Sequence, residues 1–439
     1  MAKISVDFSR TIGRIKPVNG VGQPPFLGVD FSMVDYLAEA NIPYSRLHDV
    51  GGHFGGNRFV DVPNIFSNFD ADENDPENYD FEFTDLLISA LCERGVEPYF
   101  RLGVTIENYH KVKAYRIFPP ADFGKWARIC EHIIRHYTEG WANGFYYKIT
   151  YWEIWNEPDQ PGEIDDSTKN PMWQGTPEQY YELYTVAAKH LKSCFPDLKF
   201  GGYGLCCFRS QSEHWMNYED GRHQWKYLRY ISFLEGFLKF VKEHDAPLDF
   251  FSWHTYEHEL RDLAAYCRYA RAILDSFGFT DTIISCNEWN IKVDARGSFE
   301  HAALNTATLV IFENEPLDNA EFYDARYGLS KYGSFFDPMT FKPYPVYYGF
   351  KAFGRLYALG GKAECVSDDP NVYALAATDG KRGELLIVNP TEVEKPLEIA
   401  AEREPFITLM TGEGREDGAV AFPKVLPPQS VISVMYALG

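Results

Sequence analysis

The residue of this sequence best suited to acid–base chemistry is Glu157. It follows an aromatic-rich run from Tyr151 to Trp155 and precedes Pro158. Because proline cannot donate to a sheet ladder, we expect a strand to end here, with Glu157 at its C-terminal end. The aromatic neighbours are expected to desolvate the carboxyl group and raise its pKa, which suits a general acid. Asn156 beside it could donate a hydrogen bond to a substrate hydroxyl.

A second glutamate, Glu288, ends another apolar run. It follows the residues Thr-Ile-Ile-Ser-Cys-Asn at 282–287 and precedes Trp289. Two carboxyl groups on either side of one sugar can hydrolyse a glycosidic bond, and enzymes that retain the anomeric configuration hold them about 5–5.5 Å apart. We assign the general acid/base role to Glu157 and the nucleophile role to Glu288. A structural salt bridge is the alternative for each glutamate taken alone.

The tripeptide Asn-Glu-Pro occurs a second time, at residues 314–316. It follows the amphipathic run His301–Ile311, which predicts a helix. This copy therefore belongs in a helix-to-strand loop, at the opposite end of a barrel from the first. We interpret Glu315 as non-catalytic.

Several polar residues at predicted strand ends could bind substrate or orient the carboxylates. His48 ends one such run, and His254 and Tyr256 end another. Neutral histidine and tyrosine can donate hydrogen bonds to a carboxylate nucleophile and hold it ionised. Packing in the core is the alternative for all three residues. Glu153, deeper in its strand than Glu157, is expected to pair with a core arginine.

Other strand-end residues offer stacking and charge. Trp289 and Tyr323 could stack on a sugar ring. Arg101 could hold the carboxylate of an acidic sugar. A structural ion pair or a packed position is the favoured interpretation of Arg46, Arg101 and Asp324, with substrate binding as the functional interpretation of Arg101.

No other chemical motif competes with the glutamate pair. The sequence has no phosphate-binding loop, no dinucleotide-binding glycine motif, no zinc-protease motif and no nucleophile elbow. Its eight cysteines show neither CxxC spacing nor a Cys/His cluster, so we expect no metal.

The composition of the chain indicates which kinds of binding partner are unfavourable. The net charge of −21 argues against nucleic acid and against a polybasic membrane anchor. We find no signal peptide and no apolar run of about 18 residues, so we expect a cytoplasmic protein with reduced thiols. Aromatic residues make up 16% of the chain, which would serve sugar stacking or a large aromatic core.

The spacing of apolar residues predicts the elements that carry these side chains. Strand-like runs alternate with amphipathic helical runs, which is typical of a parallel sheet. The strands are expected at Pro17–Val21, Tyr44–His48, Pro98–Gly103, Tyr151–Asn156, Lys199–Tyr203, Asp249–His254, Thr282–Glu288 and Glu321–Ala325. The helices are expected at Phe83–Arg94, Trp126–Tyr137, Gln179–Ser193, Phe233–Glu243, Leu260–Phe277, His301–Ile311 and Pro345–Leu359. This order predicts a (β/α)8 TIM barrel, an α/β fold, over residues 16–359.

The remainder of the chain has a different character. Residues 360–439 contain short strand-like runs separated by turn residues and show no helical period, which predicts a C-terminal β-sandwich domain. The alternating run Lys3–Phe8 lies within residues 1–15, which we expect to add a strand to that sandwich. The acidic stretch Asn68–Tyr79 is interpreted as a solvated loop, with the rim of a cleft as the alternative.

At these motifs the chain resembles the clan A glycoside hydrolases and, within them, glycoside hydrolase family 39, which holds β-xylosidases, α-L-iduronidases and related enzymes. The resemblance rests on Trp152–Asp159, Glu288–Asn290, Ser45–His48 and His254–Tyr256. It spans the barrel, and the C-terminal sandwich also fits the family's architecture. It implies retention of configuration and neither a metal nor an organic cofactor.

Two departures leave the sugar open. The xylosidases of the family carry a tryptophan near the position of Tyr323, and Cys286 and Asn287 before the nucleophile are also unlike a typical xylosidase. The leading hypothesis is an exo-acting retaining β-glycosidase, foremost a β-xylosidase, acting on short oligosaccharides or glycosides. The same machinery could act on an α-L-arabinofuranoside, a β-glucoside, a β-galactoside or an α-L-iduronide, the last with Arg101 or Arg326 holding its carboxylate.

An inactive sugar-binding barrel is the alternative from another class of protein. The presence of both carboxylates argues against it. The sequence leaves the oligomeric state open, and a homo-oligomer is compatible with it.

Overall fold

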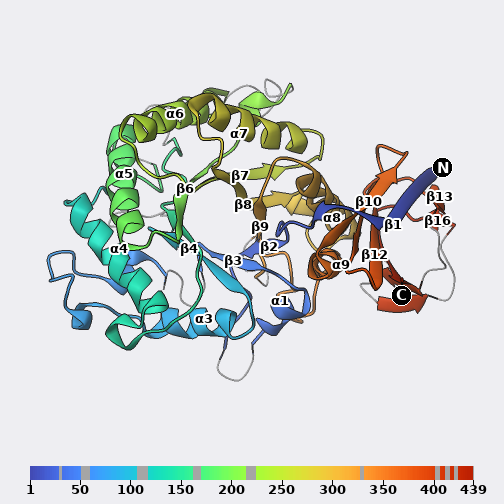
Figure 1. Ribbon diagram of the computed structural model, residues 1–439, viewed down its shortest axis with the longest axis horizontal. Helices are drawn as coiled ribbons and strands as arrows, with labels where there is room; N and C mark the ends of the chain where they lie inside the picture. Colours follow the sequence, from blue (N-terminus) through green and yellow to red (C-terminus); the bar gives the residue numbers. More distant parts are fainter. Residues whose placement is uncertain are drawn as a thin grey trace.

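The computed structural model describes residues 1–28, 32–50, 60–105, 117–161, 170–213, 224–326, 331–400, 406–410, 416–419 and 424–438. Within these residues the chain forms a closed barrel and a separate sheet that packs against one side of it (Figure 1).

The barrel is a closed sheet of eight parallel strands in sequential order (Figure 1). The strands are β2 (Gly20–Gly22), β3 (Tyr44–Leu47), β4 (Glu97–Leu102), β5 (Tyr151–Ile154), β6 (Lys199–Leu205), β7 (Phe250–Glu257), β8 (Ile283–Ile291) and β9 (Asn319–Tyr323). Pairing of β9 with β2 closes the barrel. The predicted fold class is confirmed, and all eight predicted strands overlap observed ones.

Helices cover the outside of the barrel. They are α1 (Asp35–Glu39), α2 (Val62–Ile65), α3 (Glu82–Cys92), α4 (Phe123–Thr138), α5 (Pro177–Cys194), α6 (Gln224–Glu243), α7 (Leu263–Phe277), α8 (Phe299–Asn314) and α9 (Pro345–Leu359). Local sequence fixes several ends. At the start of α5, Thr176 and Gln179 form a reciprocal capping box around Pro177. At the end of α7, Gly278 adopts the left-handed conformation that glycine favours.

Part of the barrel interior is lined by polar and charged side chains. Arg46, Glu153, Ser252 and Asn287 are each 0% exposed and lie inside the strand ring. Aromatic side chains such as Trp152 pack outward between strands and helices, where Trp152 stacks on Phe100. Buried charge of this kind needs partners, so the interior must hold a hydrogen-bonded network.

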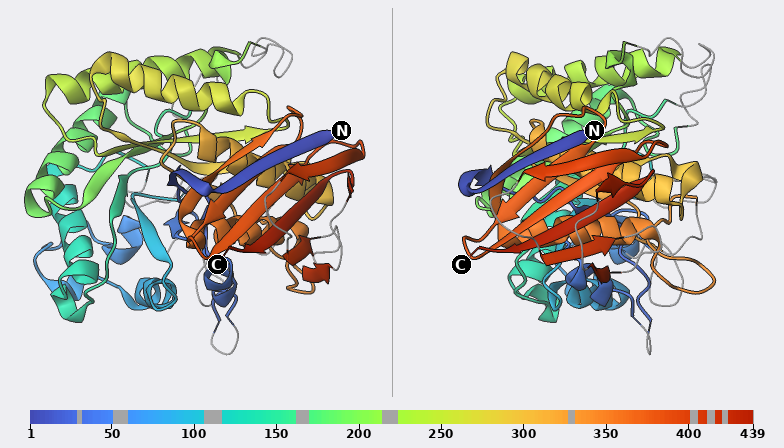
Figure 2. Two further views of the ribbon diagram at one scale, coloured as in Figure 1. Left: turned by 45° about the vertical axis from the view of Figure 1, so that its right-hand side comes forward. Right: turned by 90° about the vertical axis from the view of Figure 1, so that its right-hand side faces the viewer.

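The second sheet has nine strands in the order β15-β14-β17-β12-β11-β10-β1-β13-β16. They are β1 (Ala2–Arg14), β10 (Gly361–Ser367), β11 (Tyr373–Thr378), β12 (Arg382–Asn389), β13 (Lys395–Ala400), β14 (Phe406–Met410), β15 (Glu416–Ala419), β16 (Val425–Leu426) and β17 (Ser430–Ala437). The N-terminal β1 pairs with β10 and β13, and Figure 2 shows it lying among the C-terminal strands.

Strand β12 shows how this sheet is held to the barrel. Leu385 and Ile387 pack in the sheet's own apolar core, whereas Leu386 and Val388 pack in the core shared with the barrel. Successive side chains of a strand point to opposite faces, so β12 buries both of its faces. Helices α8 and α9 provide the barrel side of this contact. We propose that residues 1–15 and 360–439 form one structural unit and residues 16–359 the other.

All eight cysteines are free thiols. Among the described residues no helix combines the length and the apolar character needed to cross a bilayer.

Candidate active site

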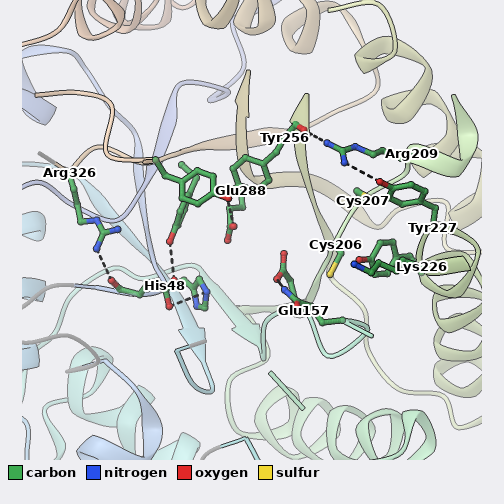
Figure 3. Close-up of a pocket in the computed structure, with 15 residues that line it drawn as sticks. His48, Glu157, Cys206, Cys207, Arg209, Lys226, Tyr227, Tyr256, Glu288 and Arg326 are labelled. Carbon is green, nitrogen blue, oxygen red and sulfur yellow. Dashed lines mark hydrogen bonds and ion pairs between the residues drawn. The ribbon is translucent and has the colours of Figure 1, made fainter. Parts of the chain in front are cut away.

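A cavity of about 550 Å³ opens at the C-terminal ends of the barrel strands (Figure 3). This volume falls within the range of about 300–1,000 Å³ that small-molecule sites occupy. The cavity is lined by His48, Asp49, Glu157, Gln160, Cys206, Cys207, Arg209, Lys226, Tyr227, Tyr230, Tyr256, Glu288, Tyr323, Arg326 and Tyr332. Both predicted catalytic glutamates are therefore in one cavity.

The backbone after β5 aims Glu157 into the cavity. Trp155 and Glu157 both have positive φ angles, of 76° and 44°, which non-glycine residues rarely adopt. These angles break the alternation of the strand, and the backbone N–H of Glu157 donates to the carbonyl oxygen of Tyr203 at 3.0 Å. Such conformations persist only where the surrounding structure holds them, and they cluster at functional sites.

Glu288 lies in β8 beside His254 of β7, where the register of β8 shifts against both neighbouring strands. Its Oε2 accepts a hydrogen bond from Nη1 of Arg46 at 3.0 Å, and its Oε1 accepts one from the hydroxyl of Tyr256 at 2.5 Å. Burial, followed by the charge of Glu288, raises the pKa of Tyr256 well above its usual value, so Tyr256 remains a donor. Two donors thus hold Glu288 in place.

His254 lies between the two glutamates. Its Nδ1 is 2.7 Å from Oε1 of Glu157 and 3.8 Å from Oε2 of Glu288. A carboxylate oxygen of each glutamate and a ring nitrogen of His254 all lie within 4.8 Å of one another. Gly204 makes room for the ring, because a Cβ there would lie 2.8 Å from Nε2 of His254.

The electrostatics of this group differ from the expectation for Glu157. Burial raises its pKa, but the hydrogen bond and charge of His254 more than offset this, so the pKa of Glu157 is lowered. The predicted rise in the pKa of Glu157 is therefore wrong, because the residues around Glu157 in the sequence do not show that His254 lies beside it. Burial, and then the charge of Glu157, raises the pKa of Glu288. Burial lowers the pKa of His254, but Glu288 and Glu157 outweigh it and the pKa is raised.

Arg46 organises the layer beneath the cavity. Its Nε donates to Oε2 of Glu153 at 2.8 Å, and its Nη2 donates to Oδ1 of Asn156 at 2.5 Å. Glu153 also accepts hydrogen bonds from Ser252 and Asn287, each at 2.6 Å. The expected pairing of Glu153 with a core arginine is confirmed. Because its oxygen is engaged, Asn156 is left with its amide N–H₂ as the group that can donate to a substrate.

A second polar group lies farther along the cavity, around Asp49. The hydroxyl of Tyr323 donates to Oδ2 of Asp49 at 3.0 Å and accepts a hydrogen bond from Gln23. Nε2 of His48 lies 3.4 Å from Oδ1 of Asp49. Burial, and then the charge of Glu288, raises the pKa of Asp49 to about 6. Burial, and then Arg101, lowers the pKa of His48 well below its usual value, so His48 is neutral.

Two predicted binding residues lie elsewhere. Trp289 is 0% exposed and packs against Phe312, Phe322 and Phe350 outside the strand ring. It follows Glu288 in β8, and its side chain points to the opposite face of the sheet. The stacking role predicted for Trp289 is wrong.

Arg101 is also 0% exposed, and its Nη2 donates to Oδ1 of Asp61 at 2.6 Å. It lies inside the barrel but does not line the cavity. Contact of Arg101 with substrate stays a prediction, and the structure shows its charge paired with Asp61.

The remaining predicted residues stay predictions as substrate ligands. His48, Tyr256 and Tyr323 line the cavity, whereas Asn156 and His254 lie beneath the glutamates, 1% and 0% exposed. The second Asn-Glu-Pro tripeptide lies elsewhere: Glu315 pairs with Arg268 at 2.6 Å, just after α8.

Several lining residues escaped the sequence analysis. Asp49 directly follows His48 and could have been found as the next polar residue at a strand end. Lys226, Tyr227 and Tyr230 are far from either glutamate in the chain, on the first turns of α6, where no local pattern marks them. The stretch Asn68–Tyr79 packs on α4 through Glu73 and lines no part of the cavity among the described residues.

Two groups of described residues bring potential metal ligands within 4.8 Å. In the group formed by Glu157, His254 and Glu288, Nδ1 of His254 is already hydrogen-bonded to Glu157. The guanidinium of Arg46 also lies 3.0 Å from Glu288. A cation in direct contact with one carboxylate disfavours a second one beside it. These residues therefore suit proton transfer better than metal binding.

Comparison with known proteins places this geometry in a family. A model of the glycosyl hydrolases family 39 matches residues 60–273, a span that includes Glu157 and ends before Glu288. A beta-xylosidase of Geobacillus stearothermophilus is 22% identical over 271 residues, which cover 56% of this chain and 47% of that protein. The chain thus spans about half the length of this relative.

Solved structures share the fold across the whole chain. A glucosidase from Croceicoccus marinus matches with a TM-score of 0.73 and 23% identity, covering 100% of this chain and 84% of that one. A family 39 beta-xylosidase from Caulobacter crescentus matches with a TM-score of 0.66 and 17% identity, covering 99% of each chain. Sequence and fold together thus support a relationship between this chain and glycoside hydrolase family 39, a family of O-glycosyl hydrolases.

Proposed function

We propose that the protein is a retaining, exo-acting glycoside hydrolase that releases a sugar from short oligosaccharides or glycosides, with β-xylosidase as its leading activity. The observation that carries this proposal is the approach of Glu157 and Glu288, whose nearest carboxylate oxygens lie within 4.8 Å. Retaining enzymes hold the two carboxyl groups about 5–5.5 Å apart, and inverting enzymes about 6.5–9.5 Å apart to admit a water. The short gap favours double displacement.

In the first step, Glu288 attacks the anomeric carbon while Glu157 gives its proton to the glycosidic oxygen. The bond from the anomeric carbon to Glu288 forms as the bond to the leaving group breaks. Arg46 and Tyr256 stabilise the ionised form of Glu288 before the attack. Their placement on Glu288 supports its role as the nucleophile.

His254 acts as a positioning residue for the general acid. The pKa of His254 is raised and the pKa of Glu157 is lowered, so a shared proton is favoured on His254. Nδ1 of His254 is 2.7 Å from Oε1 of Glu157, so this proton can move to Glu157 without a water between them. Because the two carboxylates interact, the protons belong to the group and are lost in coupled steps.

In the second step, the glycosyl ester on Glu288 is hydrolysed. Ester formation removes the negative charge of Glu288. The carboxyl group of Glu157 then has one fewer negative charge beside it and ionises more readily. Glu157 is then the base that takes a proton from the attacking water. Water attack restores Glu288 and releases a sugar of retained configuration.

The sugar at the nucleophile is expected to be neutral. The two arginines considered for an acidic sugar are both paired, Arg101 with Asp61 at 2.6 Å and Arg326 with Asp324 at 3.1 Å. The carboxyl group of Asp49 also lines this part of the cavity. This arrangement disfavours an α-L-iduronide. The curated relative is named a beta-xylosidase, which supports a β-xyloside as the leading substrate.

A β-glucoside is the second candidate, because the solved neighbour with a TM-score of 0.73 is named a glucosidase. A cytoplasmic location, with imported short glycosides as substrates, is part of the proposal and is supported by the eight free thiols. An inactive barrel is disfavoured, because both glutamates keep their hydrogen-bond donors.

A panel of 4-nitrophenyl glycosides tests this proposal. It holds the β-xyloside, β-glucoside, β-galactoside, α-L-arabinofuranoside and α-L-iduronide. Highest kcat/KM on the β-xyloside supports the leading activity, and highest kcat/KM on another member reassigns the sugar. Binding of sugars without turnover of any member would contradict an enzymatic function. The anomeric form released first, followed by proton NMR, must be that of the substrate.

A further inference from the structure

The cavity has two sides that differ in charge. Figure 3 shows Glu157 and Glu288 near its middle, with His48 and Arg326 on the Glu288 side. The opposite side, here called the leaving-group wall, is formed by Cys206, Cys207, Lys226 and Tyr227 (Figure 3).

The mechanism decides which part of the substrate faces each side. A general acid donates to the glycosidic oxygen, so the group attached to that oxygen lies next to the acid. The sugar ring lies over the nucleophile, Glu288. The part of the substrate that leaves therefore extends past Glu157 toward the leaving-group wall.

Three cations line the cavity, and their partners differ. Arg209 pairs with Glu257 at 2.9 Å, and Arg326 pairs with Asp324 at 3.1 Å. Lys226 is partly exposed and forms no hydrogen bond or ion pair in the part of the chain that the structure describes. The positive charge of Lys226 is the one that the described protein leaves uncompensated at this cavity.

We propose that the leaving-group wall selects leaving groups that carry a carboxylate, which Lys226 binds. This inference rests on the retaining hydrolase proposed above. A chain with a net charge of −21 and with Asp49 and Glu288 on the sugar side of the cavity repels anions elsewhere in the cavity. A carboxylate is therefore accepted in the leaving group and disfavoured in the sugar that is transferred.

The carboxylate could belong to a uronic acid residue or to an aromatic acid, and the chemistry of recognition is the same for both. Lysine binds as a flexible point charge, so the contact adds attraction without strict geometry. A partly exposed ion pair of this kind is expected to change kcat/KM by about two- to fivefold. The effect must weaken as salt is added, because solvent-exposed charges are screened.

The test compares matched pairs of substrates that differ in one charge. The first pair is the β-xyloside of 4-hydroxyphenylacetate and the β-xyloside of its amide, in which a methylene group insulates the phenol from the change in charge. The second pair is xylose linked to glucuronic acid and xylose linked to glucose. The readout is the ratio of kcat/KM for the acid to kcat/KM for the neutral partner, at low and at high salt.

Three variants separate a direct contact of Lys226 with the leaving group from the effect of changing the net charge of the protein. Lys226→Met keeps the apolar stem and removes the charge, and Lys226→Arg restores the charge. Lys239→Met is the matched control, because Lys239 lies on the same helix, has a side chain 70% exposed and does not line the cavity. It changes the net charge of the protein by the same amount as Lys226→Met.

The expected result is an acid-to-neutral ratio that falls about two- to fivefold in Lys226→Met, returns in Lys226→Arg and is unchanged in Lys239→Met. An equal ratio in the parent and Lys226→Met overturns the inference. Turnover of the neutral substrates shows that the hydrolase itself is intact, so such a result leaves the proposed function standing. Absence of turnover of every substrate by the parent overturns both. A preference confined to one pair identifies the source of the carboxylate.

Discussion

Nη1 of Arg46 lies 3.0 Å from Oε2 of Glu288, although the two residues are 242 positions apart in the chain. The side chain of Arg46 is 0% exposed, and the same guanidinium contacts Glu153. A buried arginine between two carboxylates offsets the cost of burying them, and removing it leaves both without a cationic partner. Arg46 thus links the barrel's internal network to the proposed nucleophile.

The substitution Arg46→Met is expected to lower the free energy of unfolding by about 3–5 kcal/mol, as is typical when one partner of a buried ion pair is removed. Arg135→Met is the control, because Arg135 forms its pairs with Glu131 and Glu139 at the surface of α4. The control should cost about 0–1 kcal/mol. Urea denaturation measures both values. Equal losses in the two variants would contradict a buried network centred on Arg46.

The hydroxyl of Tyr256 is expected to influence the acid limb of the pH profile of kcat/KM. Its hydrogen bond lowers the pKa of Glu288, whose net pKa is raised by burial and by Glu157. Tyr256→Phe removes that bond, so the pKa of Glu288 rises and the protonated, inactive form persists to higher pH. The acid limb of kcat/KM must therefore move upward in pH.

Tyr323→Phe is the comparison for this shift, because the hydroxyl of Tyr323 contacts Asp49. Loss of that bond raises the pKa of Asp49, which reduces negative charge near Glu288 around pH 6. The acid limb should then stay in place or move downward. A shift in the same direction for both variants argues against a direct role of Tyr256 on Glu288.

The loss of rate in Glu157→Ala should increase with the need of the leaving group for protonation. Loss of a general acid typically costs about 10²- to 10⁴-fold in rate for a poor leaving group. An activated 2,4-dinitrophenyl glycoside needs no proton to leave, so its first step should be nearly unaffected. Steady-state and burst kinetics on alkyl and dinitrophenyl glycosides measure the difference. Equal losses on both substrates would remove the acid/base role from Glu157.

Asp159 gives a prediction for stability against pH. Burial, and then the charge of Glu157, raises its pKa to about 7, whereas an unfolded aspartate titrates near about 3.9. Between these values the folded protein holds a proton that the unfolded chain has lost, so this group makes stability fall as pH rises. Asp159→Asn removes that loss and should raise the Tm relative to the parent more at pH 8 than at pH 5.

Asp379→Asn is the control with the opposite sign. Hydrogen bonds from the backbone N–H groups of Arg382 and Lys381 lower the pKa of Asp379 to about 2, so its ionised form is already stabilising at pH 5. The difference in Tm for this variant should be negative and should not grow between pH 5 and pH 8. A constant difference for Asp159→Asn over that range would contradict its raised pKa.

Much of the fold could be predicted because alternating patterns are local. The strand and helix periods gave the barrel, and helix α9 was predicted with both ends as observed, since Pro345 and Gly360 mark them. Glu157 was found from its own neighbours, where an aromatic run meets a proline. Strand β10 has no strong local signal, because Gly361–Ser367 has few apolar residues and pairs through its backbone with β1.

Other features depend on contacts that no local pattern encodes. Strand alternation favours a Trp289 side chain that faces away from Glu288. Alternation alone does not place these residues, because Asn287 and Glu288 both face inward where the register of β8 shifts. The lowered pKa of Glu157 depends on His254, which is 97 positions away in the chain. The role of Lys226 depends on where α6 begins relative to the strand ends. These distances are set by barrel closure rather than by the sequence around each residue.

The most direct test of the central claim is Glu288→Ala assayed with added azide. If Glu288 is the nucleophile, azide fills the space of its carboxylate and attacks the anomeric carbon of an activated β-glycoside. The predicted product is a glycosyl azide of inverted configuration, identified by NMR. Recovery of the inverted azide from Glu157→Ala instead, or full hydrolysis by Glu288→Ala without azide, would contradict the assignment.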